Sequence, residues 1–345
     1  MPVTRVQSIL FESVTACNLD CVYCYNCWKA VPDYPRGRLS TRQTIRMLKK
    51  AAVESGARQV AITGGEPLLR DDLPDLAAAL RLAGVGVSVL SNGVLMTREW
   101  AQDLVRTGVG LVQLTLLAMD EKLHDEHCGP GAFAAIFRAL DHLRAVKMRV
   151  AITLVVTKRT VEEVPKVMRV IKKIGQKSFL LNRFNPGGRA IRDHLVAELM
   201  LTKEETARML KLANDAGKAL SVTPVAAVPI PPCVVDRKKY PLVKFAGCAA
   251  ATNDAYFTLD PLGNVRMCNH SPVILGNILR QGFYEIAQDR RCREWIEVRP
   301  EFCKPCPGWD RCKGGCRAVA QQMGLALDTL DPYVAEAVKD WKPGR

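Results

Sequence analysis

The sequence lacks several features that would indicate a membrane, secreted or nucleic-acid-binding protein. No apolar run approaches the length of a membrane span. Residues 1–14 show no charged region followed by an apolar region, so we expect no signal peptide. No internal repeat or low-complexity stretch is visible. No arginine-rich tail, zinc finger or aromatic–basic RNA motif is present, which leaves nucleic acid a minor interpretation.

The composition and charge are those of a soluble globular protein. The chain has 345 residues, enough for one large domain or two ordinary ones. Hydrophobic residues make up 48% and charged residues 24% of the sequence, which are ordinary proportions. The formal net charge of +14 favours acidic peptides, phosphorylated substrates or an acidic electron donor as partners.

Cysteine is what the sequence has in abundance. There are thirteen cysteines, an odd number, and most of them are clustered. In a chain without a secretion signal, clustered cysteines indicate metal ions or metal clusters rather than disulfides. We therefore expect a reducing, cytoplasmic location.

One stretch holds three cysteines, Cys17, Cys21 and Cys24, at C-x3-C-x2-C spacing, with Tyr23 just before the third. A cubane iron–sulfur cluster normally takes four thiolates, one per iron. Three thiolates leave one iron open to a small molecule, just as a catalytic zinc keeps one position open. A structural zinc knuckle or part of a ferredoxin-like site is the alternative interpretation.

Apolar runs and helical patterns alternate along the first half of the chain. Strands are expected over 6–14, 58–63, 85–90, 110–117, 150–157 and 178–184. Helices are expected over 40–55, 73–83, 97–106, 132–146 and 161–174. Six such units predict a parallel α/β sheet, a partial (βα)6 barrel, with ligand groups at the C-terminal ends of its strands.

Three turns place polar groups at those strand ends. Gly64-Gly65-Glu66-Pro67 follows the second strand. Its glycines let the backbone approach a ligand closely, and Glu66 can accept a hydrogen bond from a cationic amine. Ser91 and Asn92 end the third strand, and Thr157 ends the fifth. Each of these three could instead be a satisfied turn residue.

The three-cysteine loop, followed one βα unit later by the GGEP turn, resembles the radical S-adenosylmethionine (radical SAM) enzymes. The resemblance implies that Cys17, Cys21 and Cys24 ligate a [4Fe–4S] cluster whose fourth iron is chelated by SAM. Cys27 is interpreted as a non-ligand, because a fourth protein thiolate would exclude SAM. The resemblance also implies SAM-binding roles for seven residues: Tyr23 by the adenine, Gly64, Gly65 and Glu66 at the methionine end, and Ser91, Asn92 and Thr157 by the ribose or carboxylate.

The fourth strand departs from the peptide-modifying radical SAM relatives. Those relatives often carry Ser-x-Asp-Gly there, then His-Asp-x-x-Arg. This chain has Thr115-Leu116-Leu117-Ala118, then His124-Asp125. Only His124 and Asp125 match, so no substrate contact is transferred from the remaining positions of that motif.

The C-terminal part holds a second cysteine set. Cys248 is followed by fourteen residues, Gly263, four residues and Cys268, and residues 256–260 and 264–267 are typical of a β-hairpin. Two zinc sites are one interpretation. The spacing, however, resembles the SPASM extension of radical SAM enzymes, which binds two auxiliary [4Fe–4S] clusters. The resemblance assigns Cys248, Cys268 and Cys316 to the first auxiliary cluster, and Cys303, Cys306 and Cys312 to the second.

The chain departs from the SPASM pattern because no cysteine follows Cys316. The second auxiliary cluster then lacks its usual fourth thiolate. Asp328, Asp331 or Cys292 could replace it, the site could be open, or only one auxiliary cluster could form.

The first auxiliary cluster also needs a fourth ligand, and we predict Cys233 for that position. Cys233 follows Pro231-Pro232, whose fixed φ angles would hold it rigidly. A free thiol at Cys233 could instead act catalytically by donating a hydrogen atom to a substrate radical. A buried apolar thiol is the purely structural alternative.

These features predict a radical SAM core over residues 1–218, a connector over 219–247 and a small cysteine-rich α+β SPASM-like domain over 248–345. The leading hypothesis is reductive cleavage of SAM to a 5′-deoxyadenosyl radical that takes hydrogen from a peptide, giving oxidation, epimerisation or a cross-link. A carbohydrate or other small molecule is the alternative substrate. A non-catalytic iron–sulfur electron carrier is the alternative from another class. A flavodoxin or ferredoxin-type protein would donate electrons.

Overall fold

The structure, a computed structural model, describes residues 6–339. Within these residues one curved sheet runs in the order β11-β10-β9-β1-β2-β3-β4-β5-β6-β7-β8. Neighbouring strands from β1 to β8 are parallel. Their bounds are β1 Ser8–Glu12, β2 Gln59–Thr63, β3 Gly86–Ser91, β4 Leu111–Thr115, β5 Val150–Val156, β6 Ser178–Arg183, β7 Thr223–Ala226 and β8 Lys244–Phe245.

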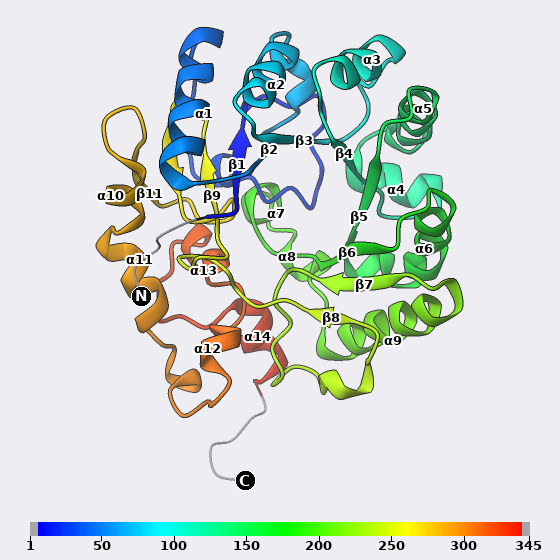
Figure 1. Cartoon of the computed structure of the whole chain (residues 1–345). Coiled ribbons are helices and arrows are strands. Elements are labelled where there is room, and N and C mark those ends of the chain that lie inside the picture. The colour runs from blue at the N-terminus through cyan, green and yellow to red at the C-terminus, as the bar shows by residue number, and fades with distance from the viewer. Residues whose placement is uncertain (1–5, 340–345) are drawn as a thin grey trace.

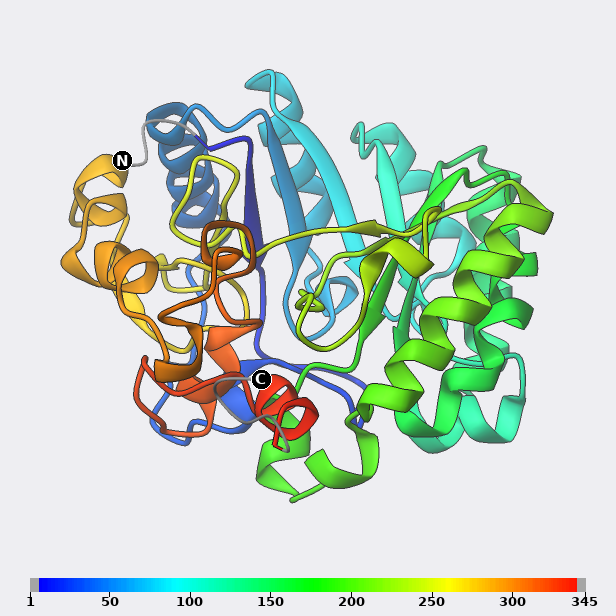
Figure 2. The same cartoon turned by 90° about the horizontal axis from the view of Figure 1, so that it is seen from below.

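The predicted partial barrel is confirmed, and its helices lie on the outer side of the strands (Figure 1). Figure 2, seen from below, shows the long helix α9 on that outer side as well. The outer helices are α1 Thr41–Ser55, α2 Leu73–Leu82, α3 Arg98–Arg106, α4 Glu121–Cys128, α5 Ala132–Ala145, α6 Val164–Lys173 and α9 Lys203–Leu220. Two short helices, α7 Gly188–Arg192 and α8 Val196–Leu199, follow β6 and are not part of that outer layer (Figure 1). No helix among the described residues is both long and apolar enough to cross a membrane.

Local capping fixes where the helices begin and end. Ser40 accepts from the backbone N–H of Gln43, whose side chain bonds back to Ser40, and Gly56 ends α1 at φ 68°. Thr202 and Glu205 form the same capping box at α9. Helix α9 ends at Ser221, whose φ of 54° lies in the left-handed region.

The strands alternate between two environments, as a period of two requires. In β3, Val87 and Val89 are buried in the core beneath the helices, whereas Ser88 and Leu90 face the inside of the barrel. In β4, Gln113 faces that interior in the same way. Polar residues at the inward positions of buried strands therefore mark a space for a ligand rather than a packed core.

The sheet extends beyond the six predicted units at both edges. The segment 219–247 contributes β7 and β8, which are too short for sequence periodicity to reveal. At the other edge, β9 Tyr256–Leu259 pairs in parallel with β1. The predicted hairpin joins β9 to β10 Asn264–Arg266, and β11 Ile274–Asn277 follows. The cysteine-rich region is thereby joined to the first strand of the barrel.

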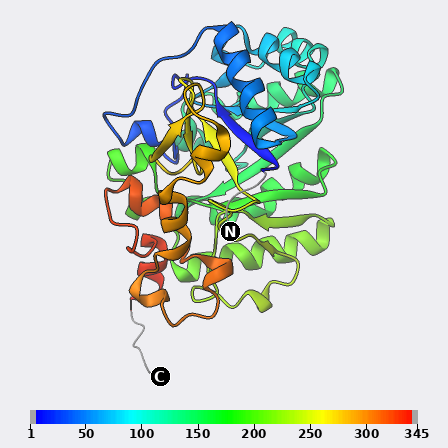
Figure 3. The same ribbon diagram turned by 60° about the vertical axis from the view of Figure 1, so that its left-hand side comes forward.

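The remaining helices are short, and irregular turns that carry the cysteines connect them. Their bounds are α10 Phe283–Ala287, α11 Arg290–Glu297, α12 Trp309–Cys312, α13 Arg317–Gln322 and α14 Pro332–Ala337. Of these helices, α10 packs against β11 beside this hairpin, and the chain continues from there toward the C-terminus at the bottom of Figure 3. The division of the chain at 219–247 stays a prediction.

Candidate functional site

A cavity of about 680 Å³ lies inside the curved sheet. Inward-facing residues of β1 to β6 line it, among them Gln113, Thr153 and Asn182. Thr153 Oγ1 and Asn182 Oδ1 are buried and have no hydrogen-bond partner within residues 6–339. Because an unpaired buried polar atom is costly, these two atoms indicate where a polar ligand binds.

Seven cysteines line this cavity: Cys128 and the two predicted triads from distant parts of the chain, which are Cys17, Cys21 and Cys24, and Cys248, Cys268 and Cys316. Burial raises the pKa of Cys17 to about 11, and the nearby thiols of Cys21 and Cys24 raise it further. Burial likewise raises the pKa of Cys268 to about 12, with the neighbouring thiols of Cys316 and Cys248 contributing. The structure therefore brings each predicted triad together.

The donor sets fit iron–sulfur clusters. Buried thiols need a nearby positive charge to become thiolates, and bound iron supplies that charge. Within residues 6–339, no three His, Cys, Asp or Glu side chains converge closely enough to hold a single metal ion. The thiolates that bind a cubane do not need to converge on one metal ion, because each of them binds a different iron.

The GGEP turn supports the three-cysteine loop through its backbone. Gly65 N donates to Val14 O at 2.7 Å, and Glu66 N donates to Ala16 O at 2.9 Å. A Cβ on Gly65 would lie 1.9 Å from Ala16 O, so only glycine permits this approach. Ala16 directly precedes Cys17, and the turn thereby fixes the position of the first cysteine.

Glu66 is completely buried and does not line the cavity, which corrects the predicted contact of its carboxylate with the SAM amine. Its Oε1 accepts from Ser91 Oγ at 2.8 Å, and its Oε2 accepts from Asn92 N at 2.8 Å. Burial raises the pKa of Glu66 to about 7, although the hydrogen bonds from Asn92, Ser91 and Leu68 oppose this. Glu66 thus joins the turns after β2 and β3.

Ser91 and Asn92 line the cavity, and their contact with SAM stays a prediction. Asn92 Nδ2 donates to Asn18 Oδ1 at 2.8 Å and lies 3.8 Å from Cys17 Sγ. The contacts from Glu66 through Asn92 to the cysteine loop form one continuous polar connection. Gly64 also lines the cavity, and its carbonyl oxygen accepts from Asn26 Nδ2 at 3.0 Å.

Thr157 does not line the cavity, so its predicted contact with SAM is corrected too. It is fully buried, and its Oγ1 hydrogen-bonds His127 Nε2 at 3.0 Å. It also caps the 3₁₀ helix Lys158–Glu163. Thr157 was predicted to contact a ligand because it ends a strand. Its hydrogen bonds fit the alternative interpretation, a turn residue whose polar groups are satisfied within the protein.

Tyr23 lines the cavity beside a thiol that no cluster triad includes. Its hydroxyl lies 3.7 Å from Cys128 Sγ, and Cys128 Sγ lies 3.8 Å from His124 Nε2. Cys128 and His124 are one turn apart on α4, and both line the cavity. Burial is the main reason that the pKa of His124 is lowered, so a neutral imidazole faces this thiol.

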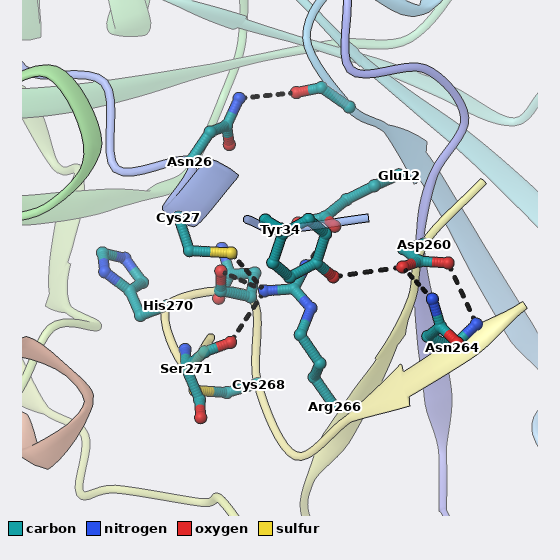
Figure 4. A network of polar contacts seen from close by, with 12 residues as sticks. Glu12, Asn26, Cys27, Tyr34, Asp260, Asn264, Arg266, Cys268, His270 and Ser271 are labelled. Carbon is teal, nitrogen blue, oxygen red and sulfur yellow. Dashed lines mark hydrogen bonds and ion pairs between the residues drawn. The ribbon is translucent and has the colours of Figure 1, made fainter. Parts of the chain in front are cut away.

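Cys27 lies outside the cavity, and its interpretation as a non-ligand stays a prediction. It is fully buried, and Arg266 Nη1 lies 3.2 Å from its sulfur (Figure 4). The same guanidinium forms an ion pair with Glu12 of β1 and donates to Asn269 O and Ser271 O, on either side of His270. Arg266 therefore ties the cysteine loop to the turn that follows Cys268.

The first auxiliary triad, Cys248, Cys268 and Cys316, is accompanied by polar residues that sequence reasoning missed. Asn185 Nδ2 lies 3.1 Å from both Cys316 Sγ and His270 Nδ1. His270 stacks on Tyr25 with ring centroids 4.4 Å apart. Burial lowers the pKa of His270 to about 3, so this imidazole is neutral. In the sequence, the alternation of strands and helices breaks at Asn185-Pro186-Gly187-Gly188, and this break was the signal that could have pointed to Asn185.

Gln322 of α13 was also missed, and it joins three parts of the site. Its Nε2 donates to Tyr25 O at 3.0 Å and to His270 O at 2.7 Å, and its Oε1 accepts from Gly188 N at 2.8 Å. No motif surrounds this glutamine, and its role depends on the three-dimensional arrangement alone.

Cys233 is not placed with the first auxiliary triad, which corrects its predicted ligation there. Burial is the main reason that the pKa of Cys233 is raised to about 12. The neighbouring thiols that contribute to this rise are Cys312, Cys303 and Cys306. Cys233 also does not line the cavity, so a catalytic role toward substrate is corrected as well. The reason is topological: the chain from β7 leaves the cavity and returns as β8 before it reaches Cys248.

Asp331 and Cys292, two of the three proposed replacements for the missing seventh cysteine, are engaged elsewhere. Asp331 is fully buried, and its Oδ2 accepts from Arg183 Nη2 and from Cys316 N, while its Oδ1 caps α14. Cys292 is buried in α11 within the apolar core, with Asp289 and Arg291 as the charged neighbours that act on its pKa. Asp328 is near Arg317: burial lowers the pKa of that guanidinium, and the charge of Asp328 acts against this lowering.

Comparisons with known families agree with this geometry. The family model of the radical SAM superfamily matches residues 11–171, and the model of the SPASM iron–sulfur cluster-binding domain matches residues 248–312. The chain belongs to the radical SAM superfamily and has a SPASM domain. As a member, this radical SAM chain uses SAM and [4Fe–4S] clusters, as predicted. The number of auxiliary clusters, one or two, stays a prediction.

Curated relatives match the radical SAM chain along nearly its whole length. Mycofactocin maturase MftC of Mycobacterium tuberculosis is 29% identical over 94% of this chain and 81% of its own. The AdoMet-dependent heme synthase of Methanosarcina barkeri is 27% identical over 98% and 97%. The PqqA peptide cyclase of Streptomyces rochei is 27% identical over 94% and 88%.

Solved structures share the fold. The structure of anSMEcpe with bound AdoMet and a Cp18Cys peptide superimposes with a TM-score of 0.72, at 21% identity, over 96% of both chains. At this identity the likeness supports the fold of the radical SAM chain and not its substrate.

Gly65→Ala should displace the cysteine loop, because its Cβ has no space beside Ala16 O. We expect the purified variant to lose about four irons per chain, one cubane. Gly84→Ala is the control. Gly84 has a positive φ of 77°, but a Cβ there would have nothing within 4 Å, so this variant should keep full iron and lose only about 1 kcal/mol of stability. Full iron in Gly65→Ala would contradict the role of this contact.

Glu66→Gln should change how stability depends on pH. Burial raises the pKa of Glu66 in the folded chain to about 7, so the folded chain binds this proton more tightly than the unfolded chain. Its contribution to the free energy of unfolding is fully present below about pH 4.5 and is lost as the pH rises through 7. Anaerobic denaturant unfolding from pH 5 to 7.5 should give a flatter profile for the variant. Glu204→Gln, at an exposed position, is the control and should give the same pH profile as the parent. If the free energy of unfolding of Glu66→Gln changes with pH as steeply as that of the parent, the assignment is refuted.

Proposed function

We propose that this radical SAM enzyme takes a hydrogen atom from a peptide, and that the product is oxidised, epimerised or cross-linked. The observation that carries the proposal is the shared cavity. Two cysteine triads, one on the loop after β1 and one in the SPASM region, open into the same space of about 680 Å³. A substrate bound there would lie between two redox centres.

In this proposal Cys17, Cys21 and Cys24 hold the cluster that binds SAM. Tyr23, Gly64, Gly65, Ser91 and Asn92 contact SAM, because all five line the cavity beside these cysteines. Glu66 acts indirectly, by holding the Ser91–Asn92 turn through two hydrogen bonds. Thr153 and Asn182 present unpaired polar atoms deeper in the barrel and are the substrate-binding candidates.

When bound, SAM and its cluster supply a 5′-deoxyadenosyl radical. Hydrogen abstraction then yields 5′-deoxyadenosine and a substrate radical, while methionine is the other product of SAM. Cys248, Cys268 and Cys316 would hold the first auxiliary cluster, which would supply an acceptor for the one electron that a substrate radical loses, together with a proton, in a net oxidation. Epimerisation instead requires a hydrogen atom from the protein.

Cys128 is the thiol placed to supply that hydrogen atom, a role that Cys233 cannot fill from outside the cavity. Its sulfur lies in the cavity wall between Tyr23 and His124, and it belongs to neither triad. Donation would leave a thiyl radical on Cys128, which must be reduced by one electron and one proton from the external donor system before the next turnover.

A peptide is the favoured substrate class because MftC and PqqA peptide cyclase, whose alignments cover most of both chains, are a maturase and a peptide cyclase by name. The net charge of +14 favours an acidic peptide and an acidic flavodoxin or ferredoxin-type electron donor. The heme synthase relative, which matches over a similar length, supports a small molecule as the alternative.

SAM cleavage tests the cluster assignment. With dithionite and SAM, the reconstituted enzyme should release 5′-deoxyadenosine, and Cys17→Ala, Cys21→Ala and Cys24→Ala should each abolish the release. Cys27→Ala is the control and should still cleave SAM, because its thiol faces Arg266 rather than the cavity. Liquid chromatography with mass spectrometry measures the product. Continued cleavage in all three single variants would overturn the assignment.

Deuterium transfer tests the substrate class. Acidic peptides encoded beside the gene, synthesised with deuterated side chains and α-carbons, should add one mass unit to the released 5′-deoxyadenosine. Asn182→Leu should reduce this transfer more than it reduces SAM cleavage alone. If the product is epimerised, reaction in D₂O should place one deuterium in it, and Cys128→Ala should remove that deuterium. Transfer from tetrapyrrole or carbohydrate substrates only would overturn the peptide assignment.

A further inference from the structure

The thirteen cysteines all lie within residues 6–339, so each has a place in the structure. Six of them form the two triads that line the cavity. Three more are not assigned to any cluster: Cys27 faces Arg266, Cys128 lies beside Cys21 and faces Tyr23 and His124, and Cys292 is buried in α11. Four remain, and they form a separate group: Cys233, Cys303, Cys306 and Cys312.

The segment that carries Cys233 is held rigidly. Ile230, Val234 and Val235 are buried on either side of it. Val234 N donates to Pro231 O at 3.0 Å, and Arg237 Nε donates to Ile230 O at 3.0 Å. These bonds close a tight turn with Cys233 at its exposed tip.

Arg183 fixes that turn to the cysteine-rich region. Its Nε donates to Pro229 O at 3.0 Å, and its Nη2 donates to Asp331 Oδ2 at 2.7 Å. The guanidinium also lies 3.8 Å from the ring centroid of Tyr333. Asp331 in turn accepts from Cys316 N at 2.8 Å. The Cys233 turn and the cysteine segment that ends at Cys316 are therefore held by one buried side chain.

A second close approach comes from the end of β8. A Cβ on Gly247 would lie 2.2 Å from Arg311 O, so the backbone here packs directly against α12. Figure 1 shows β8 and α12 on either side of α14. The connector that contains Cys233 is thus held at one end by Arg183, through Asp331, and at the other by the packing of Gly247 against Arg311, the residue before Cys312.

The facing turn arranges the other three thiols. Cys306 N donates to Cys303 O at 3.1 Å, and Cys312 N donates to Gly308 O at 3.0 Å. A Cβ added to Gly308 would lie 3.6 Å from the sulfur of Cys306, and one added to Gly314 would lie 3.4 Å from the sulfur of Cys303. Two guanidinium groups lie near these thiols: the charges of Cys312 and Cys233 act on the pKa of Arg237, and the charge of Cys303 acts on the pKa of Arg317. A guanidinium beside thiolates suits an anionic cluster.

We propose that Cys233 is the fourth thiolate ligand of the second auxiliary cluster, together with Cys303, Cys306 and Cys312. It takes the place of the cysteine that the SPASM pattern has after Cys316. The inference rests on the proposed cluster-binding function of the C-terminal cysteines. It also separates the two auxiliary sites: the second has four thiolates and lies outside the cavity, whereas the first has three thiolates in the cavity wall.

The test uses the full chain with Cys17, Cys21 and Cys24 all replaced by alanine, so that only auxiliary clusters bind iron. This parent should hold about eight irons, two cubanes. Adding Cys233→Ala should lower the iron content and remove or convert one reduced-cluster EPR signal. Cys306→Ala should affect the same signal, and Cys268→Ala should affect the other. Cys292→Ala is the matched control and should keep both signals and all eight irons.

Double variants decide the assignment. Cys233→Ala combined with Cys306→Ala should lose no more iron than Cys306→Ala alone, whereas its combination with Cys268→Ala should lose both signals. Cys233→Asp should retain iron but shift the g-values and reduction potential of one cluster, which a merely structural residue would not do. The inference is overturned if Cys233→Ala keeps eight irons with unchanged spectra, or if its loss coincides with that of Cys268→Ala. SAM cleavage by the unmodified enzyme is measured separately, so failure of the proposed reaction leaves this iron result intact.

Discussion

The buried ion pair between Glu12 and Arg266 holds the two cysteine-bearing parts of this enzyme together. Glu12 ends β1, from which the SAM-cluster loop departs, and Arg266 ends β10, two residues before Cys268. Both side chains are almost completely buried. Loss of either partner would leave an unpaired buried charge, which typically costs about 3–5 kcal/mol. The pair is therefore weak evidence for extra stability, but it specifies how β1 and the hairpin are placed together.

The pairing of β9 with β1 has a direct functional consequence. Because these strands are neighbours, Cys248, Cys268 and Cys316 reach the same cavity as Cys17, Cys21 and Cys24. A substrate in that cavity could give up a hydrogen atom on one side and an electron on the other. The group around Cys303 lies outside the cavity wall.

Backbone packing, rather than ligand side chains, positions much of the site. The GGEP turn approaches Val14 and Ala16 through its two glycines, and Glu66 holds the next turn instead of reaching into the cavity. The sequence motif correctly marked this turn but assigned its carboxylate to the wrong partner. A motif records which residues are required, and it does not separate a ligand contact from a contact that supports one.

The sequence alone determined the barrel, its strand–helix order, the capped helices and the family, because hydrophobic period, capping residues and cysteine spacing are local signals. The sequence also grouped the cysteines into the two triads, and the structure shows that both triads line the cavity. Only the tertiary structure decided the place of Cys233, the burial of Glu66 and Thr157, and the roles of Asn185, Gln322 and Arg266. Those outcomes depend on residues from different elements meeting in space, as Arg183 meets Asp331 from 148 positions away, and no local pattern encodes such a meeting.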